Sequence, residues 1–227
     1  MLVVDGISEI YEKYDALLVD QWGVLHDGRL RYEGVQEALE LLSTRGKIVI
    51  VGTNSSKSAA RNVARLAGAF GISSTLYHGL ISSAEMLRRH ILSEEKKYKK
   101  LMLIADLGDE VLFNGDSIQL VNEPKDADCL VLLSVNPEIP IDGLMNILQA
   151  SVERGLKLLT PSRDVSTVTV RGVFSGLERI CSAYEDLGGG VMNFGKPELS
   201  FYEDFRPFIR GLPASKILVV GDQLRSD

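Results

Sequence analysis

The sequence predicts an α/β fold, a Rossmann-like doubly wound parallel sheet with a smaller α/β domain inserted into it. Two observations predict this class. Short apolar runs typical of buried strands alternate with segments of helical periodicity, which is the pattern of βαβ units joined by right-handed crossovers. The chain has 227 residues, of which 45% are hydrophobic and 25% charged, so it is long enough for one or two domains with real cores.

The pattern begins with Ala16–Asp20, a short apolar run that predicts a buried strand. Apolar residues at helical spacing follow and stop before Gly46, a natural residue for a helix C-cap. Residues 47–52 are again apolar and predict a second buried strand. Residues 53–56 are polar, and their serines are suited to cap the start of the next helix.

A second series of elements begins near Gly79 and has its own apolar periodicity. It comprises strands at 101–105, 129–134 and 157–160 and helices at 141–154 and 176–187. The first pattern then resumes after residue 195 and ends with a buried strand at 216–220. We therefore expect a core of residues 1–78 and 194–227 that is interrupted by an inserted domain of residues 79–193.

Composition and charge exclude several classes of partner. The net charge is -6 without a long run of one sign, which argues against nucleic acid. No apolar run predicts a membrane span or a secretory leader, so we expect a cytoplasmic protein. Cys129 and Cys181 lie in apolar or helical patterns, which predicts buried reduced thiols. Asp227 stands where the first turn of a helix should be, so we also expect a truncated carboxyl end.

Four polar segments fall where predicted strands end or helices begin, at 20–25, 53–55, 195–197 and 221–227. A carboxylate such as Asp20, at the end of a buried strand, lies where open α/β sheets place their chemistry and can act as a nucleophile. Thr53 and the amides that follow it can hold phosphate oxygens, and Lys196 can offset their charge. Asp222 and Asp227 can bind Mg²⁺. Each segment alone is an ordinary turn or cap, but together they indicate a phosphate site.

The order and spacing of these segments resembles the haloacid dehalogenase (HAD) superfamily, in its NagD-like class IIA branch with a C2-type cap. Residues 23–28 and 32–35, which follow Asp20, are similar to motif I and the turn after it, although Glu33 stands where the family usually has proline. Residues 53–54, 195–197 and 221–227 are similar to motifs II, III and IV. The resemblance implies a HAD-type core, a C2-type cap at 79–193, and a Mg²⁺-dependent phosphatase.

The resemblance also implies a role for each site residue. Asp20 would be the nucleophile that forms an aspartyl-phosphate, and Lys196 would steady the phosphate. Thr53 and Asn54 would bind it. The implied ligands of Mg²⁺ are Asp20, Trp22 through its backbone carbonyl, Asp222 and Asp227, the last either directly or through another ligand.

Trp22 departs from the family, whose phosphatases carry an Asp there that protonates the leaving group and then activates water. Indole has no useful acid–base pKa, and losing such a group costs about 10²–10⁴-fold in rate. His26 and Asp27 are the nearest candidates to replace it, although a turn residue and an Asx-type cap are the simpler interpretations. Alternatively, substrates with good leaving groups need no acid, or hydrolysis is largely lost. The position of Trp22 favours a side chain that lines the site.

The sequence is compatible with three functions. The leading one is a phosphatase of a small phosphorylated metabolite. Hydrolysis of C–halogen bonds is the second, because haloacid dehalogenases often carry Tyr at the position of Trp22, but Asp222 and the insertion favour phosphate and metal. A phosphate- or metal-binding protein with little turnover is the third. Arg163 lies in a loop after a strand of the expected cap, and it either binds an anionic substrate or belongs to a polar turn. A homodimer through the cap is a further option.

Overall fold

The structure is a computed structural model that describes residues 3–94, 96–136, 141–169 and 172–224. These residues form two compact units, which are described separately. The first comprises Met1–Thr53, Ala59–Ile81 and Leu199–Asp227, and the second Asn54–Ser58 and Ser82–Glu198. In the part of the chain that the structure describes, no helix is both long and apolar enough to cross a membrane.

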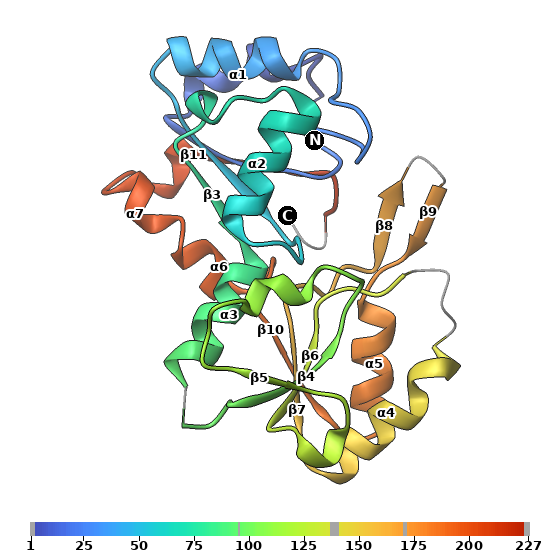
Figure 1. The fold of residues 1–227 in the computed structure, drawn as a ribbon. Helices are drawn as coiled ribbons and strands as arrows, with labels where there is room; N and C mark the ends of the chain where they lie inside the picture. Colours follow the sequence, from blue (N-terminus) through green and yellow to red (C-terminus); the bar gives the residue numbers. More distant parts are fainter. Residues whose placement is uncertain (1–2, 95, 137–140, 170–171, 225–227) are drawn as a thin grey trace. The chain divides into compact units, whose positions relative to one another are not determined.

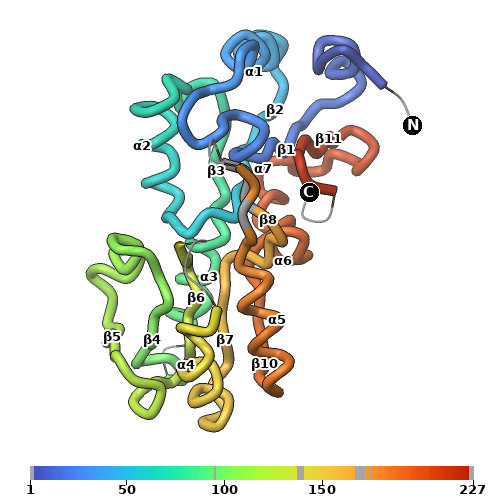
Figure 2. Tube along the Cα trace, turned by 90° about the vertical axis from the view of Figure 1, so that its right-hand side faces the viewer, coloured from blue at the N-terminus to red at the C-terminus, as the bar shows by residue number. Residues whose placement is uncertain are grey.

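The first unit contains a four-stranded sheet in the order β11-β1-β2-β3 (Figure 1). Its strands are β1 (Ala16–Asp20), β2 (Ile48–Thr53), β3 (Gly79–Ser82) and β11 (Ile217–Val220). β1 pairs in parallel with both β2 and β11. The last strand, β11, therefore lies beside the first, β1, as the red and blue strands show in Figure 2.

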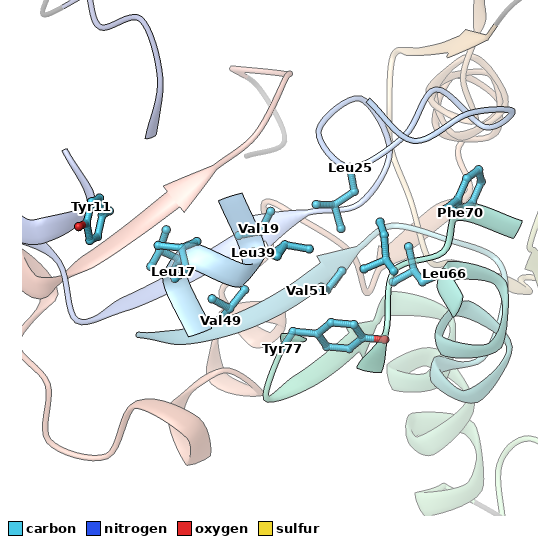
Figure 3. Close-up of a cluster of buried hydrophobic side chains, with 12 residues drawn as sticks. Tyr11, Leu17, Val19, Leu25, Leu39, Val49, Val51, Leu66, Phe70 and Tyr77 are labelled. Atoms are coloured by element: carbon cyan, nitrogen blue, oxygen red, sulfur yellow. The ribbon is translucent and has the colours of Figure 1, made fainter. Parts of the chain in front are cut away.

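Helices cover both faces of this sheet, as the continuous apolar sequence of β1 and β2 requires. The helices are α1 (Val35–Thr44), α2 (Ala59–Phe70), α6 (Leu199–Glu203) and α7 (Arg206–Ile209). Alternate residues of β1 and β2, such as Leu17 and Val49, pack in one cluster with side chains of α1 and α2 (Figure 3). On the opposite face, a Cβ added at Gly52 would lie 3.2 Å from the Phe201 ring of α6, so glycine lets that helix approach the sheet.

The second unit is built on a five-stranded sheet in the order β10-β7-β6-β4-β5, in which every neighbouring pair is parallel. Its strands are β4 (Lys100–Ile104), β5 (Gln119–Val121), β6 (Cys129–Leu132), β7 (Lys157–Thr160) and β10 (Gly190–Asn193). An antiparallel hairpin of β8 (Ser166–Thr169) and β9 (Gly172–Ser175) precedes α5.

The helices of the second unit are α3 (Ser83–Ser93), α4 (Asp142–Glu153) and α5 (Glu178–Asp186). Met102, Leu130 and Leu158 lie on three neighbouring strands and pack in one cluster with residues of α4 and α5. Both cysteines are free and buried, as expected, and burial raises the pKa of each thiol to about 12.

The predicted class of fold is confirmed by the two sheets, and the predicted strands at 16–20 and 157–160 match β1 and β7. The sequence did not predict β3, β5, β10 or the hairpin. β3, β5 and β10 are three- or four-residue strands at sheet edges, where only one neighbour is present and no continuous apolar run is needed.

The loop that leaves β1 closes around a fully buried histidine. The His26 ring has 0% exposure and stacks on Phe70 of α2, with 3.9 Å between centroids and 10° between planes. Its Nδ1 accepts the Gly28 backbone N–H at 3.0 Å, so the neutral ring carries its proton on Nε2, which lies 3.2 Å from the carboxamide nitrogen of Gln21. The Gln21 carboxamide accepts this proton when it is turned over so that its oxygen, which is buried without a partner among the described residues, faces the ring. Both ring nitrogens of His26 thus serve to hold this loop.

Burial lowers the pKa of His26 from 6.5 to about 4; the charge of Arg65 also lowers it, and Asp27 partly opposes this. The unfolded chain therefore takes up a proton at higher pH than the folded chain does. Stability from the neutral His26 is complete above about pH 6.5 and is lost as pH falls toward about 4. We expect the free energy of unfolding of wild type to fall more steeply over this range than that of His26→Gln, by up to about 1.4 kcal/mol per pH unit.

Urea unfolding at several pH values between about 7 and about 4 measures this difference. Subtracting the variant removes the contribution of the carboxylates, which titrate in both proteins. Parallel pH profiles of the two proteins would contradict a neutral, buried His26.

Candidate functional site

The register of three parallel strands brings polar residues to one edge of the first sheet. Val19 of β1 pairs with Val220 of β11, and Asp20 pairs with Gly52 of β2. The turn after β11, Asp20 at the end of β1 and Thr53 at the end of β2 therefore stand at neighbouring strand ends, on the carboxyl edge of the sheet. Asp20 is half-buried and Thr53 is 4% exposed, so this edge combines an accessible carboxylate with a buried hydroxyl.

Asp222 reaches across from the end of β11 to the loop after β1. A Cβ added at Gly23 would lie 2.2 Å from the Asp222 Oδ2 atom, far inside van der Waals contact. The φ of Gly23 is +88°, which other residues adopt only with strain. Glycine at this position thus allows the Asp222 carboxylate to lie directly against the backbone that follows Asp20.

This arrangement fits a hard divalent cation. Asp20, Asp222 and the backbone carbonyl of Trp22 are oxygen donors on neighbouring strand ends, the type of ligand that Mg²⁺ combines with water and phosphate oxygens. Within the described ranges no group of three or more His, Cys, Asp or Glu side chains could hold a metal by itself. Asp227, the fourth expected ligand, lies outside the described residues.

The Trp22 side chain is packed among neighbours from its own loop and from α2. A Cβ added at Gly28 would lie 2.2 Å from Cη2 of the indole, and the Trp22 ring meets His26 edge-on at 5.3 Å. The Arg65 guanidinium lies 5.5 Å from the indole centroid and donates from Nη2 to the Gly28 carbonyl at 3.1 Å. These contacts give the indole a packing role in the loop, alongside the lining role expected from its position.

Neither expected replacement for the missing acid is suited to that chemistry. His26 is buried and uses both ring nitrogens, as described above. Asp27 accepts the backbone N–H groups of Leu30 at 2.7 Å and Arg29 at 2.8 Å, and these bonds lower the pKa of its carboxyl. An ionised carboxylate has no proton to give to a leaving group, so the structure favours the Asx-type turn for Asp27.

The second unit holds the other two expected phosphate residues together. Asn54 Oδ1 accepts the Lys196 backbone N–H at 2.7 Å, and Asn54 Nδ2 donates to the Lys196 carbonyl at 3.2 Å. The same Nδ2 donates to Asp164 Oδ1 at 3.0 Å. A Cβ added at Gly195 would lie 2.4 Å from Asn54 Oδ1. The carboxamide of Asn54 therefore orients the backbone of Lys196, whose residue is only 4% exposed.

Arg163 is engaged by two glutamates of α5. Its Nε and Nη2 bind Glu178 at 2.7 and 2.9 Å, and its Nη1 and Nη2 bind Glu185, each at 2.8 Å. These bonds raise the pKa of Arg163. The geometry supports the polar structural role for Arg163, because its guanidinium already has two carboxylate partners.

Sequence reasoning missed a buried carboxylate that contacts the segment after Asn54. Asp109, which is 2% exposed, accepts from Ser56 Oγ at 2.8 Å, from Ser134 Oγ at 2.7 Å, and from Lys57 Nζ. The residues come from three separate loops, and each alone resembles an ordinary loop residue. The only local signal is the run of residues 55–57, two hydroxyls and a cation directly after the expected phosphate motif.

Comparison with known proteins supports the fold. Residues 17–117 match the family described as haloacid dehalogenase-like hydrolase. The 5'-nucleotidase YutF of Bacillus subtilis is 22% identical over 215 residues, 94% of this chain and 81% of that protein.

Two solved structures show how widely the fold is shared. A haloacid dehalogenase-like hydrolase from Brucella suis has a TM-score of 0.88 at 23% identity, covering 99% of this chain and 84% of that one. Glycerol phosphate phosphatase Rv1692 from Mycobacterium tuberculosis, in complex with calcium, has a TM-score of 0.72 at 21% identity, covering 96% of this chain and 63% of that one. The chain is thus similar in sequence to the haloacid dehalogenase-like hydrolases over residues 17–117, and it shares its fold with these solved structures.

Proposed function

We propose that this hydrolase cleaves phosphate monoesters of small metabolites and passes through an aspartyl-phosphate on Asp20. One observation carries the proposal: the parallel register of β1 with β2 and β11 places Asp20, Thr53 and the Asp222 turn at one sheet edge. The expected residues also match the oxygen donors that a phosphatase metal requires. The named functions of the relatives, a 5'-nucleotidase and a glycerol phosphate phosphatase, support the same substrate class.

In this proposal an oxygen of Asp20 attacks phosphorus, and the bond from phosphorus to the ester oxygen breaks. Water then attacks the acyl phosphate, releasing phosphate and restoring the Asp20 carboxylate. Thr53 and the backbone N–H of Asn54 hold the phosphate oxygens, and Lys196 offsets their charge. A bound Mg²⁺ would reduce the repulsion between the anionic nucleophile and the anionic substrate, as its presence in a relative's solved structure suggests.

Trp22 points to the kind of ester that the site accepts. The leaving oxygen normally receives a proton, and Trp22, His26 and Asp27 do not provide it. We therefore propose that the favoured substrates have leaving groups stable enough to depart unprotonated.

We also propose that residues 79–193 are a C2-type cap, which the separate sheet and core of the second unit support. A homodimer through this cap stays a prediction.

A second candidate is a phosphate- and metal-binding protein with little turnover. The packing of Trp22 against Gly28 and Arg65 favours it, because the family's acid position is filled by a structural side chain. Mg²⁺-dependent turnover that disappears in Asp20→Asn would reject this candidate. Phosphate binding without any turnover would establish it.

We expect wild type to hydrolyse p-nitrophenyl phosphate only with Mg²⁺ and to lose this activity in Asp20→Asn. Trp22→Asp should increase the turnover of an alkyl phosphate by up to about 10²–10⁴-fold, because an alkoxide needs a proton to leave. The gain for p-nitrophenyl phosphate should be much smaller. Phosphate release from both esters measures the difference.

Trp22→Phe is the matched control, because it keeps an aromatic ring on Gly28 without adding a carboxylate. Far-UV circular dichroism and urea unfolding establish that each variant is folded. Equal gains in kcat/KM for the two esters in Trp22→Asp, or a gain in Trp22→Phe, would contradict the missing-acid explanation, because kcat/KM reports the step in which the leaving group departs and not the later attack of water.

Gly23→Ala tests whether Asp222 binds the metal. The added Cβ would displace the Asp222 carboxylate, so we expect Mg²⁺ affinity to fall by about 10–100-fold. Gly34→Ala is the control: Gly34 has a similar φ of +80°, but nothing lies within 4 Å of its added Cβ. Both variants should lose about 1 kcal/mol of stability through backbone strain.

Isothermal titration calorimetry with Mg²⁺ separates the loss of metal affinity from the loss of stability. Gly34→Ala should bind Mg²⁺ as wild type does. Wild-type Mg²⁺ affinity in Gly23→Ala would show that Asp222 is not a ligand.

A further inference from the structure

The segment at residues 54–58 connects β2 to α2, yet its contacts place it in the second unit, whereas both flanking elements belong to the first. It follows Thr53 directly and begins with Asn54, whose backbone N–H the proposed function assigns to phosphate. Side chains of the second unit therefore help to set the conformation of this segment.

Three groups of contacts hold the segment. At its start, the carboxamide of Asn54 pairs with the Lys196 backbone and with Asp164. At its end, Ser82 Oγ donates to the Lys57 carbonyl at 2.5 Å. Between them, the side chains of Ser56 and Lys57 both bind Asp109.

Asp109 has the features of a rigid anchor. Its carboxylate is buried and accepts from three side chains, two of which belong to the segment. The third, Ser134, is itself oriented by the Asp106 backbone N–H, which donates to Ser134 Oγ at 2.8 Å. Burial raises the pKa of Asp109, but hydrogen bonds from Lys57, Ser134 and Ser56 outweigh it and lower the pKa overall.

We propose that Asp109 is a positioning residue for phosphate binding: its carboxylate holds Ser56 and Lys57 so that the backbone N–H groups of residues 54–56 are presented to phosphate oxygens. This inference rests on the proposed function. Asp109 itself does not contact substrate in this account, and it acts through the segment.

The second unit offers a matched control. Asp116 is also a mostly buried carboxylate paired with a cation, since it accepts from Arg88 Nε at 2.8 Å and Nη2 at 2.5 Å, and its side chain is 8% exposed. Its partner Arg88 lies on α3, outside residues 54–58. Loss of Asp116 therefore removes an ion pair of the same kind without removing an anchor of the segment.

The test compares wild type, Asp109→Asn and Asp116→Asn. Hydrogen exchange of the peptide covering residues 54–58 reports on the segment, and calorimetry with inorganic phosphate in the presence of Mg²⁺ reports on binding. We expect Asp109→Asn to speed exchange in this peptide and to weaken phosphate binding by about tenfold or more, because small displacements of positioning groups have large effects. Asp116→Asn should change neither, and Asp109→Glu should restore part of the affinity.

Several outcomes would overturn the inference. Unchanged exchange at 54–58 in Asp109→Asn would do so, as would equal losses of phosphate affinity in the two Asn variants. Tighter phosphate binding in Asp109→Asn would show that Asp109 instead holds back the charge of Lys57. A wild type that binds no phosphate would also overturn it.

Failure of the proposed function is distinguishable from these outcomes. A wild type that binds phosphate but turns over no ester would contradict the phosphatase and leave the comparison of affinities and exchange rates valid, because neither measurement needs turnover. Turnover in wild type with identical behaviour of Asp109→Asn and Asp116→Asn would leave the phosphatase and reject the role of Asp109.

Discussion

The parallel register of β1 with its two neighbours is the constraint on which the candidate site depends. In a parallel sheet all strands end at the same edge, so residues that are far apart in the chain meet there without any contact between their side chains being required. The pairing of β1 with β2 sets the positions of Asp20 and Thr53, and the pairing of β1 with β11 sets the position of the turn that contains Asp222. A change in register of one residue would turn Asp20 to the other face of the sheet and separate it from the other two.

Two glycines in the loop after β1 let side chains lie directly against its backbone. Gly23 has no side chain and adopts a positive φ, which lets the Asp222 carboxylate lie against the backbone after Asp20. Gly28 plays the same role for the indole of Trp22. The loop therefore accommodates one carboxylate at Gly23 and one large aromatic ring at Gly28, and both close approaches depend on glycine.

The loop after β1 uses the Trp22 side chain for packing. Trp22, His26, Phe70 and Arg65 form one connected group of ring and cation contacts that ties the loop to α2. The neutral His26 and the ionised Asp27 have pKa values shifted away from the neutral range by burial and by backbone hydrogen bonds, respectively. Such values suit fixed structural partners and do not suit proton transfer at neutral pH.

The sequence by itself determined the class of fold, most central strands, and the order of the polar segments, because buried parallel strands leave continuous apolar runs and their ends carry polar residues. Edge strands such as β5 and β10 leave no such signal. Tertiary structure alone decided the partners of each polar group: Asn54 with the Lys196 backbone, Arg163 with two glutamates, and Asp109 with Ser56 and Lys57. The physical reason is that a hydrogen bond between two loops depends on the distance between them in the folded chain. Local sequence patterns do not determine that distance.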